Sequence, residues 1–226
     1  MANHCFTTYK IQGTEKAVKE LFTAIVSLQT TINEYERCTD NDKEFLEDVL
    51  TANGLEHVLE ELKTTISIRL RLRDLAAHFG IDCEENDIHC RGHIYNAEYE
   101  PSENLLTIET DTAWVGCNYL FYIINEVLGG ELSISHRERE RGTELFRVHD
   151  EGGFFPEECI VHGIGKRFKG LYFVYFDTIE AAIHEWCSRM GVERGDKSEE
   201  EMVEYINKYV YTDEGNYFHL YKITVV

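Results

Sequence analysis

Six side chains that could bind a ligand or take part in catalysis lie in three short stretches of the sequence, 88–100, 104–112 and 131–141. They combine imidazole, guanidinium and carboxylate groups, and they are His89, Arg91, His93, Glu109, Asp111 and Arg137. Alternate residues of a β-strand point to the same side, so we predict that these side chains share one face of a sheet. Such a face could bind a small anion or a metal ion. The sequence favours a simpler interpretation, a solvated polar face crossed by weak ion pairs.

Other chemical signals in the sequence are weaker. Cys83, His89, Cys90 and His93 have the residue types of a zinc site, but on a strand Cys90 points away from both histidines and cannot complete a tetrahedron. Cys117 lies near a predicted helix N-terminus, where the pKa of a thiol can fall, yet no partner base is identifiable. The sequence has no nucleophile elbow, phosphate-binding loop or zinc-protease motif. We therefore predict no catalytic residue, no metal site and no cofactor.

The stretch that leads to Trp114 is predicted as the central strand, because apolar and polar side chains alternate along it. Leu106 and Ile108 point to one side, whereas Glu109 and Asp111 point to the other, as expected for a strand with one buried face. We expect Trp114 itself to pack in the core between this strand and the helix that follows, with the wall of a pocket as the alternative.

The order of the predicted elements indicates an α+β fold. The elements are strand 5–12, helix 14–37, strands 88–100 and 104–112, helix 117–128 and strand 131–141. This is the β-α-β-β-α-β order of a ferredoxin-like sandwich. Residues 38–86 are predicted as a helical insertion, in which 64–73 fits either a strand or a helix, with a helix favoured over 69–79.

We predict a ferredoxin-like domain at 1–165 and a C-terminal β-α-α-β unit at 166–226 that packs on the same core. The C-terminal elements follow from apolar periodicity and one capping serine. They are strand 170–176, helix 178–190, a helix after Ser198 and strand 217–225.

The composition limits the classes of partner. The chain has 42 acidic and 22 basic residues and a formal charge of −20, which disfavours binding to nucleic acid and to anionic membranes. It has no apolar run close to the ~18 residues of a membrane span and no secretion signal at its start. Seven scattered cysteines give no disulfide framework, so we expect reduced thiols and a cytoplasmic location.

Four stretches of the sequence resemble one known family. They are Met1-Ala2-Asn3-His4-Cys5 followed by Gly13, Cys90-Arg91-Gly92-His93-Ile94, Thr110-Asp111-Thr112-Ala113-Trp114, and residues 149–157. These stretches are similar to the YubB-type ferredoxin-like proteins, which are common on conjugative plasmids, phages and integrated elements of bacteria. The resemblance covers about 88–163 and 1–13. It departs at Val115-Gly116, where the family often has prolines, and at 137–142, where it often has an acidic pair with glycine.

The resemblance implies a ferredoxin-like fold and an association with mobile genetic elements, and it implies no activity. Three functions are therefore compared. The first is a non-enzymatic accessory protein that binds a protein partner through a shallow polar sheet face or through the acidic C-terminal unit. The second is a small-molecule or metal-dependent enzyme in which His89, His93, Glu109 and Asp111 converge around a concavity. The third is an acidic mimic of DNA. The sequence does not predict the oligomeric state.

Overall fold

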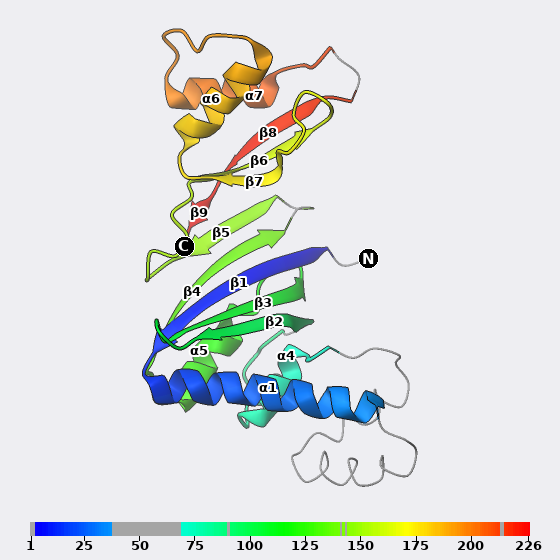
Figure 1. Cartoon of the computed structure of the whole chain (residues 1–226), viewed down its shortest axis with the longest axis vertical. Coiled ribbons are helices and arrows are strands. Elements are labelled where there is room, and N and C mark those ends of the chain that lie inside the picture. The colour runs from blue at the N-terminus through cyan, green and yellow to red at the C-terminus, as the bar shows by residue number, and fades with distance from the viewer. Residues whose placement is uncertain (1–2, 38–68, 90, 141, 143, 213–214) are drawn as a thin grey trace. The chain divides into compact units, whose positions relative to one another are not determined.

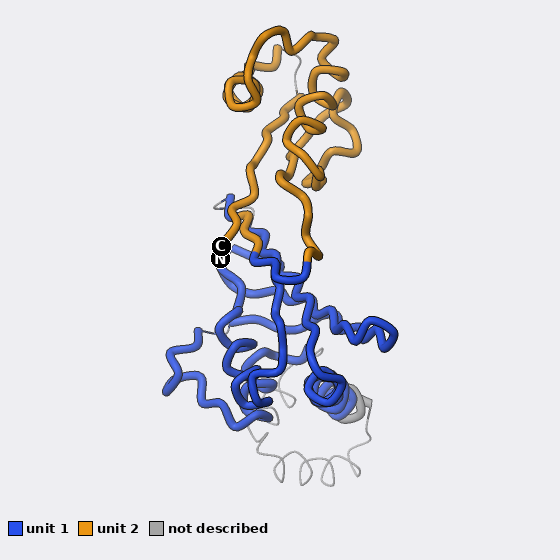
Figure 2. The backbone as a smooth tube through the Cα atoms, turned by 90° about the vertical axis from the view of Figure 1, so that its left-hand side faces the viewer, with its two compact units in different colours: residues 1–145, 149–152 blue, residues 146–148, 153–226 orange. Residues whose placement is uncertain are grey.

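A computed structural model describes residues 3–37, 69–89, 91–140, 142, 144–212 and 215–226. This part of the chain is mixed α+β, with five helices and nine strands, and the expected fold class is confirmed at that level. Two compact units are distinguished in Figure 2: unit 1 comprises residues 1–145 and 149–152, and unit 2 comprises residues 146–148 and 153–226.

Unit 1 is built on four antiparallel strands that lie side by side in the order β2-β3-β1-β4. Their bounds are β1 His4–Gly13, β2 Gly92–Glu100, β3 Leu105–Ala113 and β4 Leu132–Glu140. The order continues through β5 (Leu145–His149) to the short β9 (Thr224–Val225), so the sheet has six strands. Strand β3 pairs with β2 on one side and β1 on the other, which confirms its predicted central position.

The helices of unit 1 lie on one side of this sheet (Figure 1). They are α1 Glu15–Arg37, α4 Leu72–His78 and α5 Asn118–Val127. The Thr14 hydroxyl accepts a hydrogen bond from the backbone N–H of Ala17 at the start of α1, which satisfies one of the donors that a helix N-terminus leaves open. Leu106 and Ile108 are fully buried in the core beneath the helices, as the alternation along β3 predicts.

The prediction for the helical insertion is tested only in its last part. Of the helix expected over 69–79, Leu72–His78 is helical as α4, whereas Arg71 forms an isolated bridge with His93 and the Leu70 carbonyl accepts the Ile94 N–H. The part of the predicted insertion at 38–68 lies outside the described residues.

Two local expectations are wrong. Strand β2 begins at Gly92, not at residue 88, because a turn with a left-handed Asp87 (φ 54°) precedes it and the Ile88 N–H bonds to the Cys83 carbonyl at 2.7 Å. Trp114 is 49% exposed and left-handed (φ 72°). Its N–H bonds to the Asn3 carbonyl, so β3 ends in a turn there and the indole ring is not a core group.

Unit 2 contains a three-stranded antiparallel sheet and two helices. The strands are β6 Cys159–Ile164, β7 Tyr172–Phe176 and β8 Tyr217–Lys222, in the order β7-β6-β8. Helix α6 (Ile179–Met190) is capped by Thr178, and α7 (Glu199–Lys208) by a Ser198–Glu201 capping box. The expected boundary near residue 165 differs from this division, because β6 pairs with both β7 and β8 and so belongs to unit 2.

The core position of β3 gives a first testable prediction. Replacing Ile108 with Ala removes a fully buried side chain and is expected to lower the free energy of unfolding by about 2–5 kcal/mol. The neighbouring Thr107→Ala on the opposite face is the matched control and should change it by less than about 1 kcal/mol. Urea unfolding followed by circular dichroism measures both, and equal losses for the two variants would contradict the assignment of faces.

Candidate functional site

The side of the unit 1 sheet opposite the helices carries a polar surface, here called the open face. Its residues alternate with buried ones along β1–β4 and align in rows across the strands. The first row is His93, Asp111, Phe6 and Arg139, and the second is Asn96, Glu109, Thr8 and Arg137. Cross-strand neighbours lie about 5 Å apart, so each row places four different chemical groups side by side, and adjacent members can contact each other.

The first row is tied together by polar contacts at its β2 end. His4 Nδ1 lies 2.8 Å and 3.0 Å from the two carboxylate oxygens of Asp111. The Arg69 guanidinium donates to His93 Nε2 at 3.0 Å, which leaves Nδ1 to carry the proton of a neutral ring. Burial lowers the pKa of His93, and the nearby Asp111 carboxylate opposes that shift. His93 is therefore held as a neutral acceptor beside an arginine.

The other end of the first row combines a cation with aromatic rings. The Arg139 guanidinium lies over the Phe6 ring, 6.0 Å from its centre, a cation–π geometry. The Tyr95 ring meets Phe6 edge-on at 6.5 Å, and the His4 ring stacks on Phe6 at 6.3 Å. A β-bulge between Ile94 and Asn96 shifts the register of β2, so that Asn96 lies on the same face as Tyr95.

The second row and its neighbours form fewer polar and ring contacts than the first row. Asn96 Nδ2 donates to a Glu109 oxygen at 3.2 Å, and Lys10 Nζ donates to the Thr107 hydroxyl at 2.9 Å. An amide and a carboxylate thus pair between β2 and β3, and an ammonium and a hydroxyl pair between β1 and β3. These contacts are exposed or half-buried, so each contributes little to folding.

Four of the six predicted residues lie together on the open face: His93, Glu109, Asp111 and Arg137. His89 does not join them, because it lies in the segment before β2, whereas Arg91 stands beside the end of β3, where its carbonyl accepts the Ala113 N–H at 2.8 Å. The His89 side chain is 92% exposed and lies 3.4 Å from Asp87. Within the described residues, no group of three or more His, Cys, Asp or Glu side chains is arranged to hold a metal ion.

Sequence reasoning missed members of this face that include His4, Phe6 and Asn96. The signal for the first two was present in β1, where Cys5, Thr7 and Tyr9 are buried and the residues between them point outward. The bulge that brings Asn96 to the same side left no comparable signal in the sequence.

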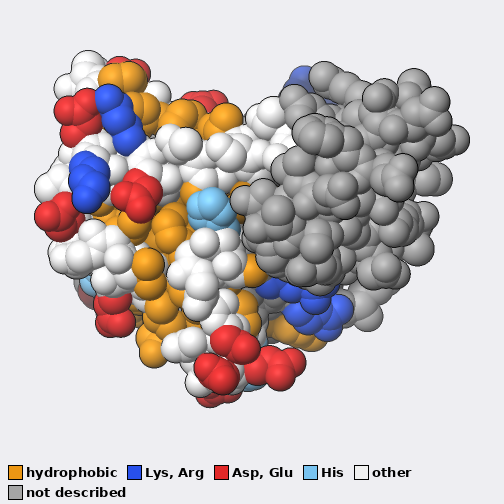
Figure 3. Space-filling view, turned by 90° about the horizontal axis from the view of Figure 1, so that it is seen from below, with side chains coloured by type: hydrophobic (Ala, Val, Ile, Leu, Met, Phe, Trp, Pro, Cys, Tyr) orange, Lys and Arg blue, Asp and Glu red, His pale blue; other side chains and the backbone are white. Residues whose placement is uncertain are grey.

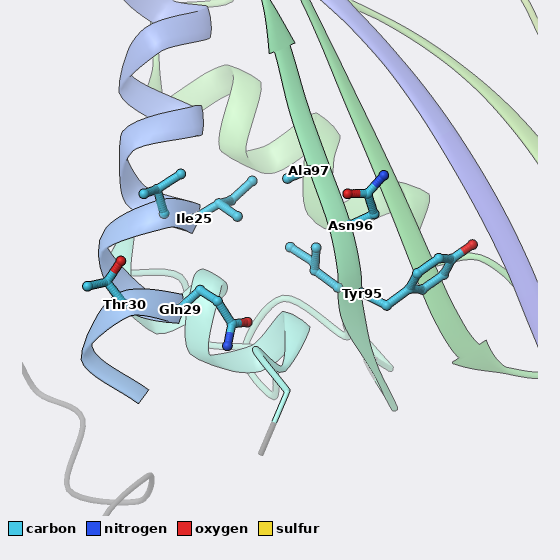
Figure 4. A pocket seen from close by; sticks show the side chains of 8 residues that line it. Ile25, Gln29, Thr30, Tyr95, Asn96 and Ala97 are labelled. Carbon is cyan, nitrogen blue, oxygen red and sulfur yellow. The ribbon is translucent and has the colours of Figure 1, made fainter. Parts of the chain in front are cut away.

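A groove of about 290 Å³ lies between α1 and the edge strand β2. Ile25 and Gln29 point from α1 toward β2, whereas the Tyr95 ring points away from the groove (Figure 4). The Gln29 side-chain oxygen accepts the Leu70 N–H at 3.2 Å. The described residues that line the groove are apolar or uncharged polar, so it has no convergent charged groups among them.

Seen from below, acidic and basic side chains are scattered among apolar ones on the described surface of unit 1 (Figure 3).

A buried polar cluster lies between the sheet and the start of α5, and the sequence did not predict it. The Glu138 carboxylate is 4% exposed. It accepts the Gly116 N–H at 3.0 Å and the Asn118 amide at 2.5 Å, and Asn118 in turn accepts the Tyr9 hydroxyl at 2.9 Å. The alternation of Arg and Glu along β4 is typical of a charged edge strand, but Glu138 and Glu140 are buried.

His136 extends this cluster toward β5. Its Nε2 lies 3.2 Å from the Tyr122 hydroxyl, and its ring stacks on His149 at 5.5 Å. Burial lowers the pKa of His136 to about 4, although Glu138, with an oxygen 3.6 Å from Nδ1, acts in the opposite direction. The imidazole is therefore neutral at pH 7 and serves as a packed hydrogen-bonding group.

The cysteines give no sign of a reactive thiolate among the described residues. Burial raises the pKa of Cys5 to about 11 and of Cys159 to about 12, and it also raises that of Cys83 and Cys187. These four are free thiols. Cys117 is disulfide-bonded, so the expectation of reduced thiols is wrong at this position.

No protein-family model, curated protein or solved structure matches this chain. The resemblance to the YubB-type family therefore stays a prediction. Among the described helices, none has the length and apolar character needed to cross a membrane.

The lowered pKa of His136 predicts a pH dependence of stability. An unfolded histidine takes up its proton near pH 6.5, whereas the folded protein resists until about pH 4. Protons therefore favour the unfolded chain in this window, and the free energy of unfolding should fall by up to about 3 kcal/mol between pH 6.5 and pH 4. His136→Gln should flatten that part of the profile in urea titrations, while His184→Gln, at an exposed histidine of α6, should leave it unchanged. An unchanged slope in His136→Gln would contradict the assignment.

Proposed function

We propose that this chain is a non-enzymatic binding protein that docks a protein partner on the open face of unit 1. The observation that carries the proposal is the pair of rows across four strands, in which rings, amides and charges of both signs lie side by side. Each of these groups has a partner on the same face that it can exchange for one on another protein. Aromatic and arginine side chains such as Phe6, Tyr95 and Arg139 are the residue types that contribute most to protein interfaces.

The size of the face supports a transient contact. Strands of nine or ten residues at the usual rise and spacing cover about 30 Å by about 19 Å, or roughly 570 Å². Stable complexes bury about 800 Å² on each partner, and weaker signalling contacts bury less. We therefore propose a partner that binds reversibly and with both acidic and basic groups.

The two alternative functions have less support. An enzyme that uses His89, His93, Glu109 and Asp111 requires them to converge, but His89 points into solvent at a distance from β2. Mimicry of DNA requires rows of carboxylates, whereas the rows of the open face alternate acidic residues with Arg137 and Arg139 and so lack the uniform charge of a phosphate backbone.

We also propose that unit 1 is a ferredoxin-like domain of a cytoplasmic protein associated with a mobile element. The chain order β1-α1-β2-β3-α5-β4 and the strand order β2-β3-β1-β4 support the fold, with α4 and the strands beyond β4 as additions. The free thiols of Cys5 and Cys159 support the location, while the disulfide of Cys117 does not fit it. The association with a mobile element rests on the sequence resemblance alone.

A photo-crosslinking comparison tests the proposed docking face. A photoreactive residue at Thr8, in the second row, is compared in host cells with one at Thr23 on α1. We expect a discrete partner to be captured from Thr8 and not from Thr23. With that partner purified, Asp111→Asn and Arg139→Gln should each weaken binding at least about tenfold, since each removes a charged group from the interface.

Two substitutions on α1, Lys16→Gln and Glu20→Gln, provide matched charge changes away from the open face and should leave the affinity unchanged. Thermal unfolding of all four variants separates loss of binding from loss of folding. Equal capture from both crosslinker positions, or full affinity in Asp111→Asn and Arg139→Gln, would refute docking at this face.

A further inference from the structure

A second surface, in unit 2, carries a different chemistry. Helices α6 and α7 lie on one side of the β7-β6-β8 sheet (Figure 1), where Val161, Phe218 and Leu220 pack against Trp186. The residues that alternate with these point to the other side, which we call the ring face. They are Ile160, His162 and Ile164 from β6, Tyr172, Phe173 and Tyr175 from β7, and Tyr217, His219 and Tyr221 from β8.

The ring face has no Asp, Glu, Lys or Arg among these nine strand residues, in a chain of which 28% is charged. Its rings contact one another closely. His162 stacks on Phe173 at 4.2 Å, and the rings of Tyr172 and Tyr217 both meet His162 edge-on at 5.3 Å. His219 stacks on Tyr217 at 6.3 Å. The edges of these rings carry two hydroxyls and two imidazoles that can form hydrogen bonds.

A β-bulge gathers these rings at one place. The register of β6 against β7 shifts between Val161 and His162, and Phe173 takes a left-handed conformation with φ 53°. In a regular strand, Tyr172 and Phe173 would point to opposite faces; here both contact His162. A left-handed non-glycine residue inside a strand costs about 1–3 kcal/mol and persists only where the surrounding structure holds it. The packed rings around His162 hold Phe173 in this conformation.

One end of the ring face is accessible and the other is covered. Ile160 and Phe173 form a small core with Phe146. In contrast, Tyr172 is 59% and Tyr217 38% exposed. At the usual strand spacing the accessible end measures about 14 Å by about 10 Å, on the order of 150 Å². That area is far below the ~800 Å² of a stable protein interface, so it fits a ligand of one or two rings.

Positive charge flanks the accessible end. The loop that joins β6 to β7 carries Lys166, Arg167 and Lys169, all exposed, and the Arg167 N–H bonds to the side chain of Asn216, next to Tyr217. Residues 153–226 contain eight basic and thirteen acidic residues, so they contribute −5 of the net charge of −20. Asp213 and Glu214 lie outside the described residues. This part of the chain is thus also net acidic, and the positive charge beside the ring face is a local feature of the β6–β7 loop.

We propose that the ring face binds a nucleotide, with the planar base stacked on Tyr172 and Tyr217 and the phosphate bound by Lys166 and Lys169. Every nucleobase has a π-face that an aromatic side chain can stack on, and ammonium groups bind phosphate oxygens. The ligand is a free nucleotide or one unit of a single strand, since both offer the same base and phosphate. The site is independent of the docking surface proposed for unit 1.

Binding of small probes to the full chain, followed by calorimetry and NMR, tests this site. The probes are AMP, adenosine, ribose 5-phosphate and a ten-residue thymidine oligonucleotide. We expect AMP and the oligonucleotide to bind, and ribose 5-phosphate to bind at least about tenfold more weakly because it has no base to stack. An oligonucleotide affinity well above that of AMP identifies a single strand as the source, and similar affinities identify a free nucleotide.

Variants assign the two halves of the ligand. Tyr172→Ala and Tyr217→Ala should each weaken AMP binding about tenfold, within the range of one lost stacking contact, whereas Tyr119→Ala, at a similarly exposed tyrosine (57%) on α5, should not. The double variant Lys166→Gln/Lys169→Gln should weaken AMP binding and leave adenosine unaffected. Lys197→Gln/Lys208→Gln is its charge-matched control. Absence of binding by AMP and the oligonucleotide at millimolar concentration, equal binding of ribose 5-phosphate, or full affinity in the tyrosine variants would overturn the proposal.

Discussion

The register of β1 between β3 and β4 is the constraint on which unit 1 depends. Tyr9 pairs with Ile108 on one side and with His136 on the other, and this alignment places Leu106, Ile108 and Ile134 beneath the helices together. A slip of one residue would turn the apolar side chains of a strand to the opposite face. The same register fixes the open face, because the residues between the buried ones align as rows of mixed charge. The core and the polar surface are thus two consequences of one pairing.

That constraint explains why much of unit 1 could be predicted from the sequence. Along β3, Leu106 and Ile108 alternate with Glu109 and Asp111, and a period of two is a strong signal for one buried face. Long amphipathic segments such as α1 also carry a clear periodicity. The start of β2 was misplaced because a left-handed Asp87 forms a turn before the strand. Left-handed residues are usually glycines, so an aspartate at this position gave no sequence signal for the turn. Trp114 was misplaced for a related reason, since its residue type indicates burial while its backbone forms a turn.

Glu138 shows a different limit of sequence reasoning. A carboxylate in an alternating Arg–Glu run is expected in solvent, because burying an unpaired charge is very unfavourable. Here two donors that are distant in sequence, the Gly116 N–H and the Asn118 amide, compensate for the lost water. Gly116 also allows the close approach, since a side-chain carbon at that position would lie 2.8 Å from the Thr7 hydroxyl and 3.1 Å from the Glu138 carboxyl carbon. Glu138 is buried because of these tertiary contacts, and the local sequence pattern of β4 does not predict that burial.

In each unit, one side of the sheet is not covered by a described helix of that unit, and the two sides differ in chemistry. Each of them contains a β-bulge. In unit 1 the bulge in β2 adds Asn96 to a face of polar and charged groups, where removing water from ions would be costly and favours exchangeable contacts. In unit 2 the bulge in β7 adds an aromatic ring to a face without charges, where removing water costs little and ring stacking can contribute directly. Bulges re-aim side chains at the expense of ladder hydrogen bonds, so neither irregularity stabilises the sheet that contains it. Their shared effect is to place two consecutive side chains, Tyr95 and Asn96 in β2 and Tyr172 and Phe173 in β7, on the side that no described helix of the same unit covers. This links the two proposed binding surfaces to a common structural cause.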